Sequence, residues 1–182
     1  MIGVVGPNGS GKSVCCEYLA RHDYHVFSLS DNVRAEAQLR KRALTRDNLI
    51  LTGNELKSQF GTTILAERVF HQAQELSSER LVFDSIRHPD EALFLRGKGV
   101  YLLGITANLK LRYQRIMARK KETDRVSFEQ FKEHDIVEAS GNSVGQHVLK
   151  TLELCDGLIE NEQGLAEFEI QLHDILSYES SL

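Results

Sequence analysis

The sequence of 182 residues lacks the features of several large classes of protein. It has only two prolines and no stretch rich in Ser, Gly or Pro, so we expect a single domain over residues 1–182. It has no apolar run of the roughly 18 residues that a membrane-spanning helix needs. Positive charge is not in excess, since 22 Lys and Arg stand against 26 Asp and Glu for a net charge of -4. This balance argues against broad binding of nucleic acid or of acidic membranes.

Cysteine is also scarce. The chain has three cysteines, of which Cys15 and Cys16 are adjacent, and it has no Cys-x-x-Cys spacing. An odd number without that spacing predicts neither a disulfide framework nor a zinc site, and reduced thiols are typical of proteins inside the cell. The apolar start of the chain runs directly into a glycine-rich loop, which is not the form of a signal peptide. We therefore expect a cytoplasmic protein.

A glycine-rich loop near the start of the chain is the most informative stretch. Residues 6–13 read Gly-Pro-Asn-Gly-Ser-Gly-Lys-Ser, and they lie between an apolar run at 2–5 and helical spacing from Lys12 to Arg21. This pattern predicts a loop whose backbone N–H groups surround a phosphate. Its glycines allow positive φ angles and close approach of the anion, and the following helix directs its positive N-terminal end at the same charge.

The loop predicts ATP and Mg²⁺ as ligands. Lys12 is expected to reach the β- and γ-phosphates, and the hydroxyl of Ser13 is expected to bind Mg²⁺. The residues of this region that are expected to contact the nucleotide are Gly6, Asn8, Gly9, Ser10, Gly11, Lys12, Ser13 and Val14.

Short apolar segments alternate with helical spacing along the rest of the chain. Strands are expected at 2–5, 25–29, 81–84, 100–106 and 157–159. Strands that alternate with helices predict an α/β fold of three layers, in which helices cover both faces of a five-stranded parallel sheet. The segment from 35 to 60 is expected to be helical, with a break at Gly53. Ligands of such sheets bind beyond the carboxyl ends of the strands, so we look for chemistry there.

Two strand ends carry an aspartate followed by an arginine. Asp31 and Arg34 follow the second strand at a spacing of three, on one helix face. Asp31 is expected either to accept a proton from an attacking hydroxyl or to hold Mg²⁺ through water, and Arg34 to bind an acceptor phosphate; a surface ion pair is the alternative. Asp84 ends the third strand, where a carboxylate orients Mg²⁺ unless it belongs to an ordinary turn. Arg87 is expected in the same cleft as a phosphate ligand.

A basic helix follows the fourth strand. It carries Arg112, Arg115 and Arg119, and Arg125 follows a polar break. Mobile arginines that close over a γ-phosphate stabilise the charge that develops in phosphoryl transfer. We therefore expect Arg115, Arg119 and Arg125 to belong to a flap, with Arg115 and Arg119 acting in catalysis. Arg112 is interpreted as solvated surface.

These stretches, taken in order, resemble the nucleoside-monophosphate kinase and dephospho-coenzyme A kinase branch of the P-loop kinases. Within that branch the chain is most similar to an archaeal group described as adenylate-kinase-related. The resemblance covers nearly the whole chain and implies the P-loop NTPase fold with helical insertions for a lid and for the acceptor. It rests on GPNGSGKS, LSDNVRAEA, TRDNLILTGNEL, VFDSIRHPDE, RYQRIMARKKETDR and CDGLIENEQGL.

The resemblance implies roles for the residues that match family motifs on the acceptor side. In adenylate kinases, one arginine after strand two and another in an Asp-Gly-x-Pro-Arg stretch bind the acceptor phosphate. Arg34 and Arg87 match these positions, although the second stretch here is Asp-Ser-Ile-Arg, which is one residue shorter and lacks the proline. In dephospho-coenzyme A kinases, an aspartate after strand two activates the acceptor hydroxyl, and Asp31 matches it. The helical segment of about residues 32–61 is expected to bind the acceptor.

On the donor side the resemblance implies two further features. Asn161, in the stretch Asn-Glu-Gln-Gly, is similar to a family motif near the adenine. Arg115, which is also expected to contact the nucleotide, belongs with Arg119 and Arg125 to a lid of about residues 115–130.

The combined prediction is an ATP- and Mg²⁺-dependent kinase for a small nucleotide-like acceptor, either a nucleoside monophosphate or dephospho-coenzyme A. Transfer to a sugar hydroxyl would need Asp31 as a base, whereas a monophosphate oxygen is already ionised. The alternative is a regulatory ATPase switch that hydrolyses ATP with a partner protein. The length of the chain and the lack of a Leu-Ser-Gly-Gly-Gln stretch disfavour a transporter-type ATPase, and the net charge of -4 disfavours a nucleic-acid acceptor.

Overall fold

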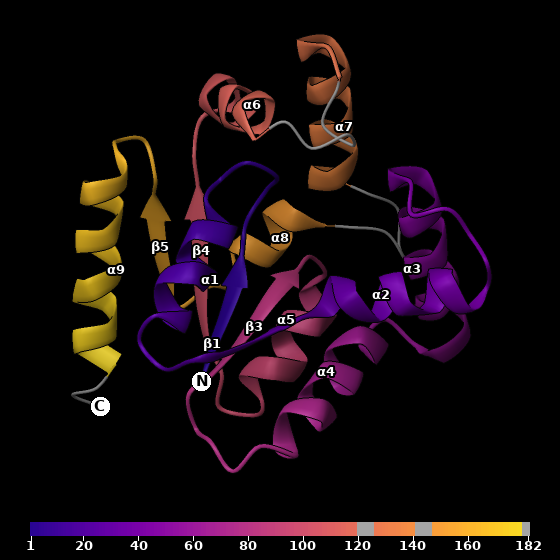
Figure 1. The fold of residues 1–182 in the computed structure, drawn as a ribbon, viewed down its shortest axis with the longest axis horizontal. Coiled ribbons are helices and arrows are strands. Elements are labelled where there is room, and N and C mark those ends of the chain that lie inside the picture. Colours follow the sequence, from indigo (N-terminus) through magenta and orange to yellow (C-terminus); the bar gives the residue numbers. More distant parts are fainter. Residues whose placement is uncertain (120–125, 141–146, 180–182) are drawn as a thin grey trace.

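A five-stranded parallel sheet forms the centre of the molecule (Figure 1). The computed structural model describes residues 1–119, 126–140 and 147–179. The strand order is β2-β3-β1-β4-β5, and every pairing is parallel. The predicted α/β class with a parallel sheet of five strands is therefore confirmed. The strands are β1 (Ile2–Val5), β2 (His25–Ser28), β3 (Leu81–Ile86), β4 (Tyr101–Thr106) and β5 (Gly157–Glu160).

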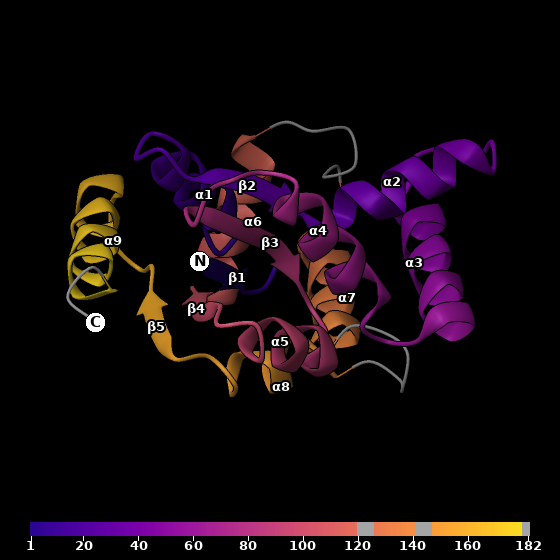
Figure 2. The same ribbon diagram turned by 90° about the horizontal axis from the view of Figure 1, so that it is seen from below.

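Helices connect the strands and cover both faces of the sheet. Helices α1 and α9 pack on one face, while α4, α5 and α8 pack on the other. Figure 1 shows α6 and α7 beyond the carboxyl ends of the strands, and Figures 1 and 2 place α2 and α3 at the end of the molecule opposite α9. The helices of the described residues are α1 (Lys12–Ala20), α2 (Leu29–Leu39), α3 (Arg46–Phe60), α4 (Ile64–Gln74), α5 (Pro89–Arg96), α6 (Leu109–Ala118), α7 (Phe128–Ser140), α8 (Val148–Leu152) and α9 (Leu165–Glu179).

The core consists of two apolar layers, one on each face of the sheet. Successive side chains of a strand point to opposite faces, so Val4 packs toward α1 and α9 whereas Val5 packs toward α4 and α5. All four residues of β1 are buried, as expected for a central parallel strand. Cys15 lies in the layer under α1, where burial raises the pKa of its thiol to about 12 and the nearby Asp84 adds to the shift. The thiol is therefore neutral and serves packing.

The acceptor-side segment departs from the sequence expectation at Gly53. This glycine does not break a helix. It lies inside α3, and the interruption falls at residues 40–45 instead. Gly53 is buried against Val33 of α2, whose methyl carbon would lie 3.7 Å from a Cβ at position 53. This is an ordinary van der Waals distance, so α2 and α3 pack against each other here without requiring a glycine. In the described ranges, no helix is long and apolar enough to span a membrane.

Candidate active site

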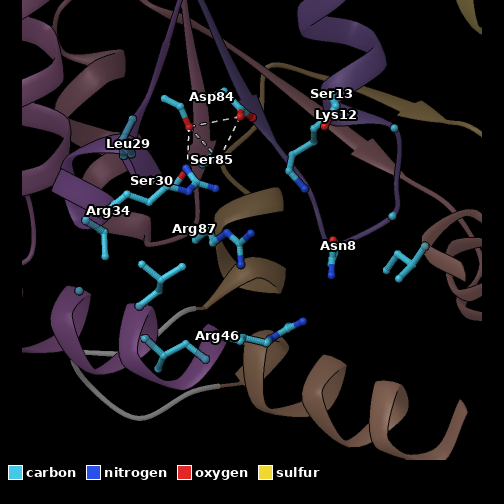
Figure 3. Close-up of a pocket in the computed structure, with 18 of the residues that line it drawn as sticks. Asn8, Lys12, Ser13, Leu29, Ser30, Arg34, Arg46, Asp84, Ser85 and Arg87 are labelled. Atoms are coloured by element: carbon cyan, nitrogen blue, oxygen red, sulfur yellow. Dashed lines mark hydrogen bonds between the residues drawn. The ribbon is translucent and has the colours of Figure 1, made fainter. Parts of the chain in front are cut away.

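A cavity of about 1060 Å³ lies beyond the carboxyl ends of β1, β2 and β3. Figure 3 shows Asn8, Lys12 and Ser13 on one side of it, Ser30 and Arg34 on the opposite side, and Arg87 between them. We call the side formed by residues 8–14 the loop side, and the side formed by α2, α3 and the chain that follows β3 the helix side. The cavity therefore brings together elements that are far apart in the sequence.

The loop side depends on glycine at positions that no other residue fits. Gly9 and Gly11 have φ angles of +81° and +116°, which disfavour any side chain. A Cβ at Gly9 would lie 2.6 Å from the carbonyl oxygen of Arg112, and one at Gly11 would overlap the amide nitrogen of Asn161. A Cβ at Gly6 would overlap the carbonyl oxygen of Ile105. The loop is thus pressed against the chain that follows β4 and β5.

Lys12 and the start of α1 place positive charge at the same point of the loop. The Nζ atom of Lys12 donates to the carbonyl oxygens of Gly6 at 2.6 Å and Pro7 at 2.8 Å. Helix α1 begins at Lys12 and has no acidic residue in its first turn. A helix N-terminus and an ammonium group together form a site that suits a phosphate. Ser13, the second residue of α1, lines the cavity beside them.

Asp84 lies where β3 carries an irregularity. The pairing of β1 with β3 runs from Gly3–Phe83 to Val5–Ile86, so β3 has one extra residue there, and Ser85 takes a φ of +66°. Positive φ at a serine is strained, and such bulges redirect side chains at functional sites. The strand therefore continues to Ile86, and the expectation that it ends at Asp84 is wrong. Both Asp84 and Ser85 nevertheless line the cavity.

The carboxylate of Asp84 is satisfied on one oxygen only. Its Oδ2 accepts from the hydroxyls of Ser85 at 3.0 Å and Ser28 at 3.4 Å. Its Oδ1 is buried and has no hydrogen-bond partner among the described residues. A buried carboxylate oxygen without a partner is costly. Mg²⁺ is held through one or two carboxylates together with substrate phosphates and water, so Asp84 and the hydroxyl of Ser13 fit this ion.

A chain of serine hydroxyls connects Asp84 to the helix side. Ser28 Oγ lies 2.9 Å from Ser30 Oγ, which accepts from Arg34 Nη1 at 2.7 Å. Figure 3 shows Asp84, Ser85, Ser30 and Arg34 at the cavity. The structure thus brings Arg34 to the same wall as Asp84.

Asp31 does not reach the cavity. Leu29, Val33 and Ala37 bury one face of α2, which leaves the side chain of Asp31 73% exposed. Its carboxylate pairs with Arg34 at 2.7 Å, and Asp31 is absent from the residues that line the cavity. The arrangement is that of the surface ion pair left open by the sequence, and a catalytic role for Asp31 stays a prediction.

Several cavity residues on α3 were missed by sequence reasoning. Arg46 and Lys57 line the helix side, and Lys57 pairs with Glu91 of α5 at 2.8 Å. Lys57 and Glu91 are buried, with 7% and 1% of their surfaces exposed. One sequence signal was available, because the cavity residues of α3 recur every three or four positions, as one helix face does. They are Arg46, Leu49, Ile50, Gly53, Asn54 and Lys57.

Arg115 and Arg119, two arginines of the predicted lid, contact the loop. Arg115 Nη2 donates to Asn161 Oδ1 at 3.1 Å, and the buried Asn161 in turn donates from Nδ2 to the carbonyl oxygen of Ser10 at 2.9 Å. Burial lowers the pKa of the Arg115 guanidinium, and the charge of Glu162 opposes this shift. Arg119 Nη2 donates to Asn8 Oδ1 at 3.3 Å. Both arginines therefore lie on the loop side.

The interpretation of Arg112 as solvated surface is wrong. Its guanidinium is buried and forms two hydrogen bonds, of 2.6 and 2.7 Å, to the carboxylate of Asp135 on α7. It also donates to the carbonyl oxygens of Ala107 at 2.9 Å and Asn8 at 3.3 Å. Arg112 thereby joins α6, α7 and the loop. Arg125, together with the rest of 120–125 in the predicted lid, lies outside the described residues.

Comparison with known proteins agrees with this geometry. A family model described as an AAA domain matches residues 2–138. A UPF0200 protein of Pyrobaculum aerophilum is 30% identical over 179 residues, which cover 97% of this chain and 96% of the relative. The predicted resemblance to an archaeal P-loop group is confirmed.

Two solved structures share the fold. TT1252 from Thermus thermophilus gives a TM-score of 0.63 at 20% identity, covering 97% of this chain and 96% of that one. Shikimate kinase from Acinetobacter baumannii, solved in complex with shikimate, gives 0.60 at 17% identity, covering 99% and 92%. At such identities the likeness concerns the fold alone. The chain therefore belongs to the AAA domain family and to the UPF0200 proteins, and it has the fold of the P-loop kinases.

Proposed function

We propose that this protein is an ATP- and Mg²⁺-dependent small-molecule kinase whose acceptor is nucleotide-like. The observation that carries the proposal is the cation set across the cavity from the phosphate-binding loop. Arg34 and Lys57 line the cavity on the helix side, and Arg87 lies between Arg34 and Lys12. A second set of cations is what an anionic second substrate requires.

The loop side supplies the donor half of the reaction. Lys12 and the backbone N–H groups of the loop bind the phosphates of ATP. Asn161 and Arg115 border the part of the cavity where the adenine ring of ATP is expected. Mg²⁺, held through Ser13 and Asp84, would neutralise charge on the phosphates. An acceptor oxygen attacks the γ-phosphorus, the new O–P bond forms, the bond to the β–γ bridging oxygen breaks, and ADP leaves.

The size of the cavity supports transfer to an acceptor rather than to water. Its volume of about 1060 Å³ slightly exceeds the roughly 300–1,000 Å³ of pockets that hold one small ligand. An ATPase switch needs space beside the γ-phosphate only for a water molecule. The helix side therefore favours a kinase over the regulatory ATPase that the sequence left open.

The walls of the helix side support an acceptor with a flat apolar part as well as an anionic group. Aliphatic side chains line it next to the cations, and they suit the face of a nucleobase better than a small polyhydroxylated acid. These side chains belong to Val33 of α2, Leu44 of the α2–α3 connection, Leu49 and Ile50 of α3, and the neighbouring Leu65 of α4. This half coincides with α2 and α3, which fill the acceptor-side segment proposed at about residues 32–61.

The placement of Asp31 favours a nucleoside monophosphate over dephospho-coenzyme A within that class. A sugar hydroxyl needs a base, but Asp31 lies outside the cavity. A phosphate oxygen is already ionised and needs none. We therefore propose transfer to a nucleoside monophosphate as the first reaction to test.

The test is an acceptor panel. Purified protein is incubated with ATP and Mg²⁺ and with AMP, CMP, GMP, UMP, dephospho-coenzyme A or shikimate, and products are identified by mass spectrometry and ³¹P NMR. A diphosphate product from at least one nucleoside monophosphate is expected. If calorimetry shows that the protein binds ATP but none of the acceptors becomes phosphorylated, the proposal is contradicted. ATP hydrolysis that no acceptor stimulates would favour the switch.

A further inference from the structure

A buried ion pair lies on the helix side of the cavity. Lys57 Nζ of α3 is 2.8 Å from Glu91 Oε1 of α5, and both residues line the cavity. Their surfaces are only 7% and 1% exposed. The pair connects the helix that borders the acceptor half to the chain segment that carries Arg87.

The local hydrogen bonds explain why residue 91 has a side-chain acceptor oxygen, but they do not explain why that side chain is negatively charged. Glu91 Oε2 accepts from the backbone N–H groups of Arg87 at 3.1 Å and His88 at 3.0 Å, and the second of these bonds belongs to the capping box of α5. A glutamine would supply the same acceptor, since capping boxes use either residue. The negative charge of Glu91 therefore needs another reason, and Lys57 is the cation beside it.

Stability does not require the pair either. Replacing a buried ion pair by uncharged residues of similar volume is often neutral or stabilising, whereas removing one partner alone is strongly destabilising. The stability of the packing between α3 and α5 therefore does not explain why position 57 carries an ammonium rather than an uncharged side chain. An ammonium does, however, carry three donor hydrogens. Within the described ranges, Glu91 is the partner seen for Lys57, at a single oxygen.

We infer that Lys57 binds the phosphate group of the acceptor and that Glu91 positions it. The inference rests on the proposed function, because it assigns a residue to the acceptor half of that site. One carboxylate holds two cations in place: Glu91 binds the ammonium of Lys57 directly and the backbone of Arg87 through its N–H. Lys57 then directs its other donor hydrogens into the cavity. An acceptor phosphate bound there would also contact Arg87 and Arg34, which line the same cavity.

The experiment measures AMP binding while the loop side is filled. The protein is saturated with ADP and Mg²⁺, and AMP is titrated by calorimetry into the wild type, Lys57→Met, Glu91→Gln and the double variant Lys57→Met/Glu91→Gln. Melting temperature and the dissociation constant for ADP are recorded for each. We expect Lys57→Met and the double variant to bind AMP about tenfold or more weakly, with ADP binding unchanged.

The double variant separates binding from packing. Lys57→Met alone leaves a buried carboxylate unpaired and lowers the melting temperature, and the double variant regains it because no unpaired charge is left. A purely structural pair would regain AMP affinity together with stability. We expect stability to return and AMP affinity to stay low. Recovery of AMP affinity in the double variant overturns the inference, as does a wild type that binds no AMP beside ADP.

A second ion pair that involves α3 provides the control. Glu55 of α3 pairs at 2.7 Å with Arg42 of the α2–α3 connection, and neither residue lines the cavity. The variant Arg42→Met/Glu55→Gln should therefore bind AMP within about twofold of the wild type. A loss as large as that of the Lys57 variants would assign the effect to α3 in general and overturn the inference.

Two further outcomes distinguish the inference from the proposed function. Binding of AMP that depends on Lys57 without phosphoryl transfer to any acceptor contradicts the proposed function and supports the inference. Phosphoryl transfer that proceeds equally well in the Lys57 variants supports the proposed function and contradicts the inference. Shikimate is titrated in a parallel arm, and Lys57-dependent binding of shikimate in place of AMP would assign the anion as a carboxylate and overturn the phosphate assignment.

Discussion

The two sides of the cavity recognise their ligands by different means. The loop side is one short stretch of chain that presents backbone groups, fixed by glycines at positive φ and by a helix that starts at Lys12. The helix side is assembled from α2, α3 and the chain after β3, and it presents long side chains. Backbone donors fit any phosphate chain, whereas a set of side chains can be exchanged without altering the sheet. Under the proposed function, this difference predicts that the loop side binds the donor without regard to the acceptor and that the helix side determines which acceptor is used.

The largest expected effect comes from Lys12→Ala on the loop side. Its ammonium acts by charge placement, so the variant should fold normally and lose about 10²–10³-fold in kcat with any active acceptor. Activity and thermal melting check this prediction. Lys110→Ala, an exposed lysine on α6, is the matched control and should behave as the wild type. A Lys12→Ala variant with near-normal kcat would show that the loop is not the donor site.

Asp84→Asn is the next test, because Asp84 lies where the two sides meet. Asparagine keeps an oxygen for Ser28 and Ser85 but loses the charge, so we expect a loss of about 10²-fold in kcat and a higher Mg²⁺ concentration for half-maximal activity. A Mg²⁺ titration of the rate measures both. Glu17→Gln, an exposed carboxylate at the same cavity, should leave the Mg²⁺ dependence unchanged. An unchanged titration in Asp84→Asn would contradict the metal role.

On the helix side, Arg87→Ala sharpens the comparison by separating the two substrates. Loss of a cation that faces the acceptor should lower kcat/KM for the acceptor by about tenfold to a hundredfold while the dissociation constant for ATP stays within about twofold. Steady-state kinetics and calorimetry give the two numbers. Arg96→Ala, at the far end of α5, is the control. If ATP binding and acceptor kcat/KM fall by the same factor, the two sides do not bind separate substrates, and the comparison fails.

The parts of this site that could be predicted from sequence are those encoded locally. The loop was recognised because its glycines and Lys12 occur at fixed offsets that the backbone requires. Arg87 was placed correctly because parallel strands end at one edge of a sheet. The strand boundary near it could not be predicted, since positive φ at Ser85 has no sequence signal.

What could not be predicted depends on contacts between distant residues. Arg112 is buried because its partner Asp135 lies 23 positions along the chain, which spacing on one helix cannot reveal. Lys57 was missed because α3 was read as two helices divided at Gly53. The orientation of Asp31 could not be predicted either, because it depends on how α2 is rotated about its axis. Burial of Leu29 and Val33 turns Asp31 outward.

The smallest expected effect belongs to Asp31→Asn, and it decides which atom of the acceptor is attacked. If the attacking atom is a phosphate oxygen, no base is needed and the variant should keep kcat within about threefold of the wild type. If it is a hydroxyl, α2 must turn Asp31 into the cavity on binding, and the loss should reach about 10²-fold or more. The rates of the wild type and the variant, measured with a nucleoside monophosphate and with dephospho-coenzyme A, distinguish the two. Asn32→Ala, at the half-buried neighbouring position on α2, controls for changes in the helix itself. A large loss confined to Asp31→Asn would restore the hydroxyl acceptor, and with it dephospho-coenzyme A, as the substrate that the helix side selects.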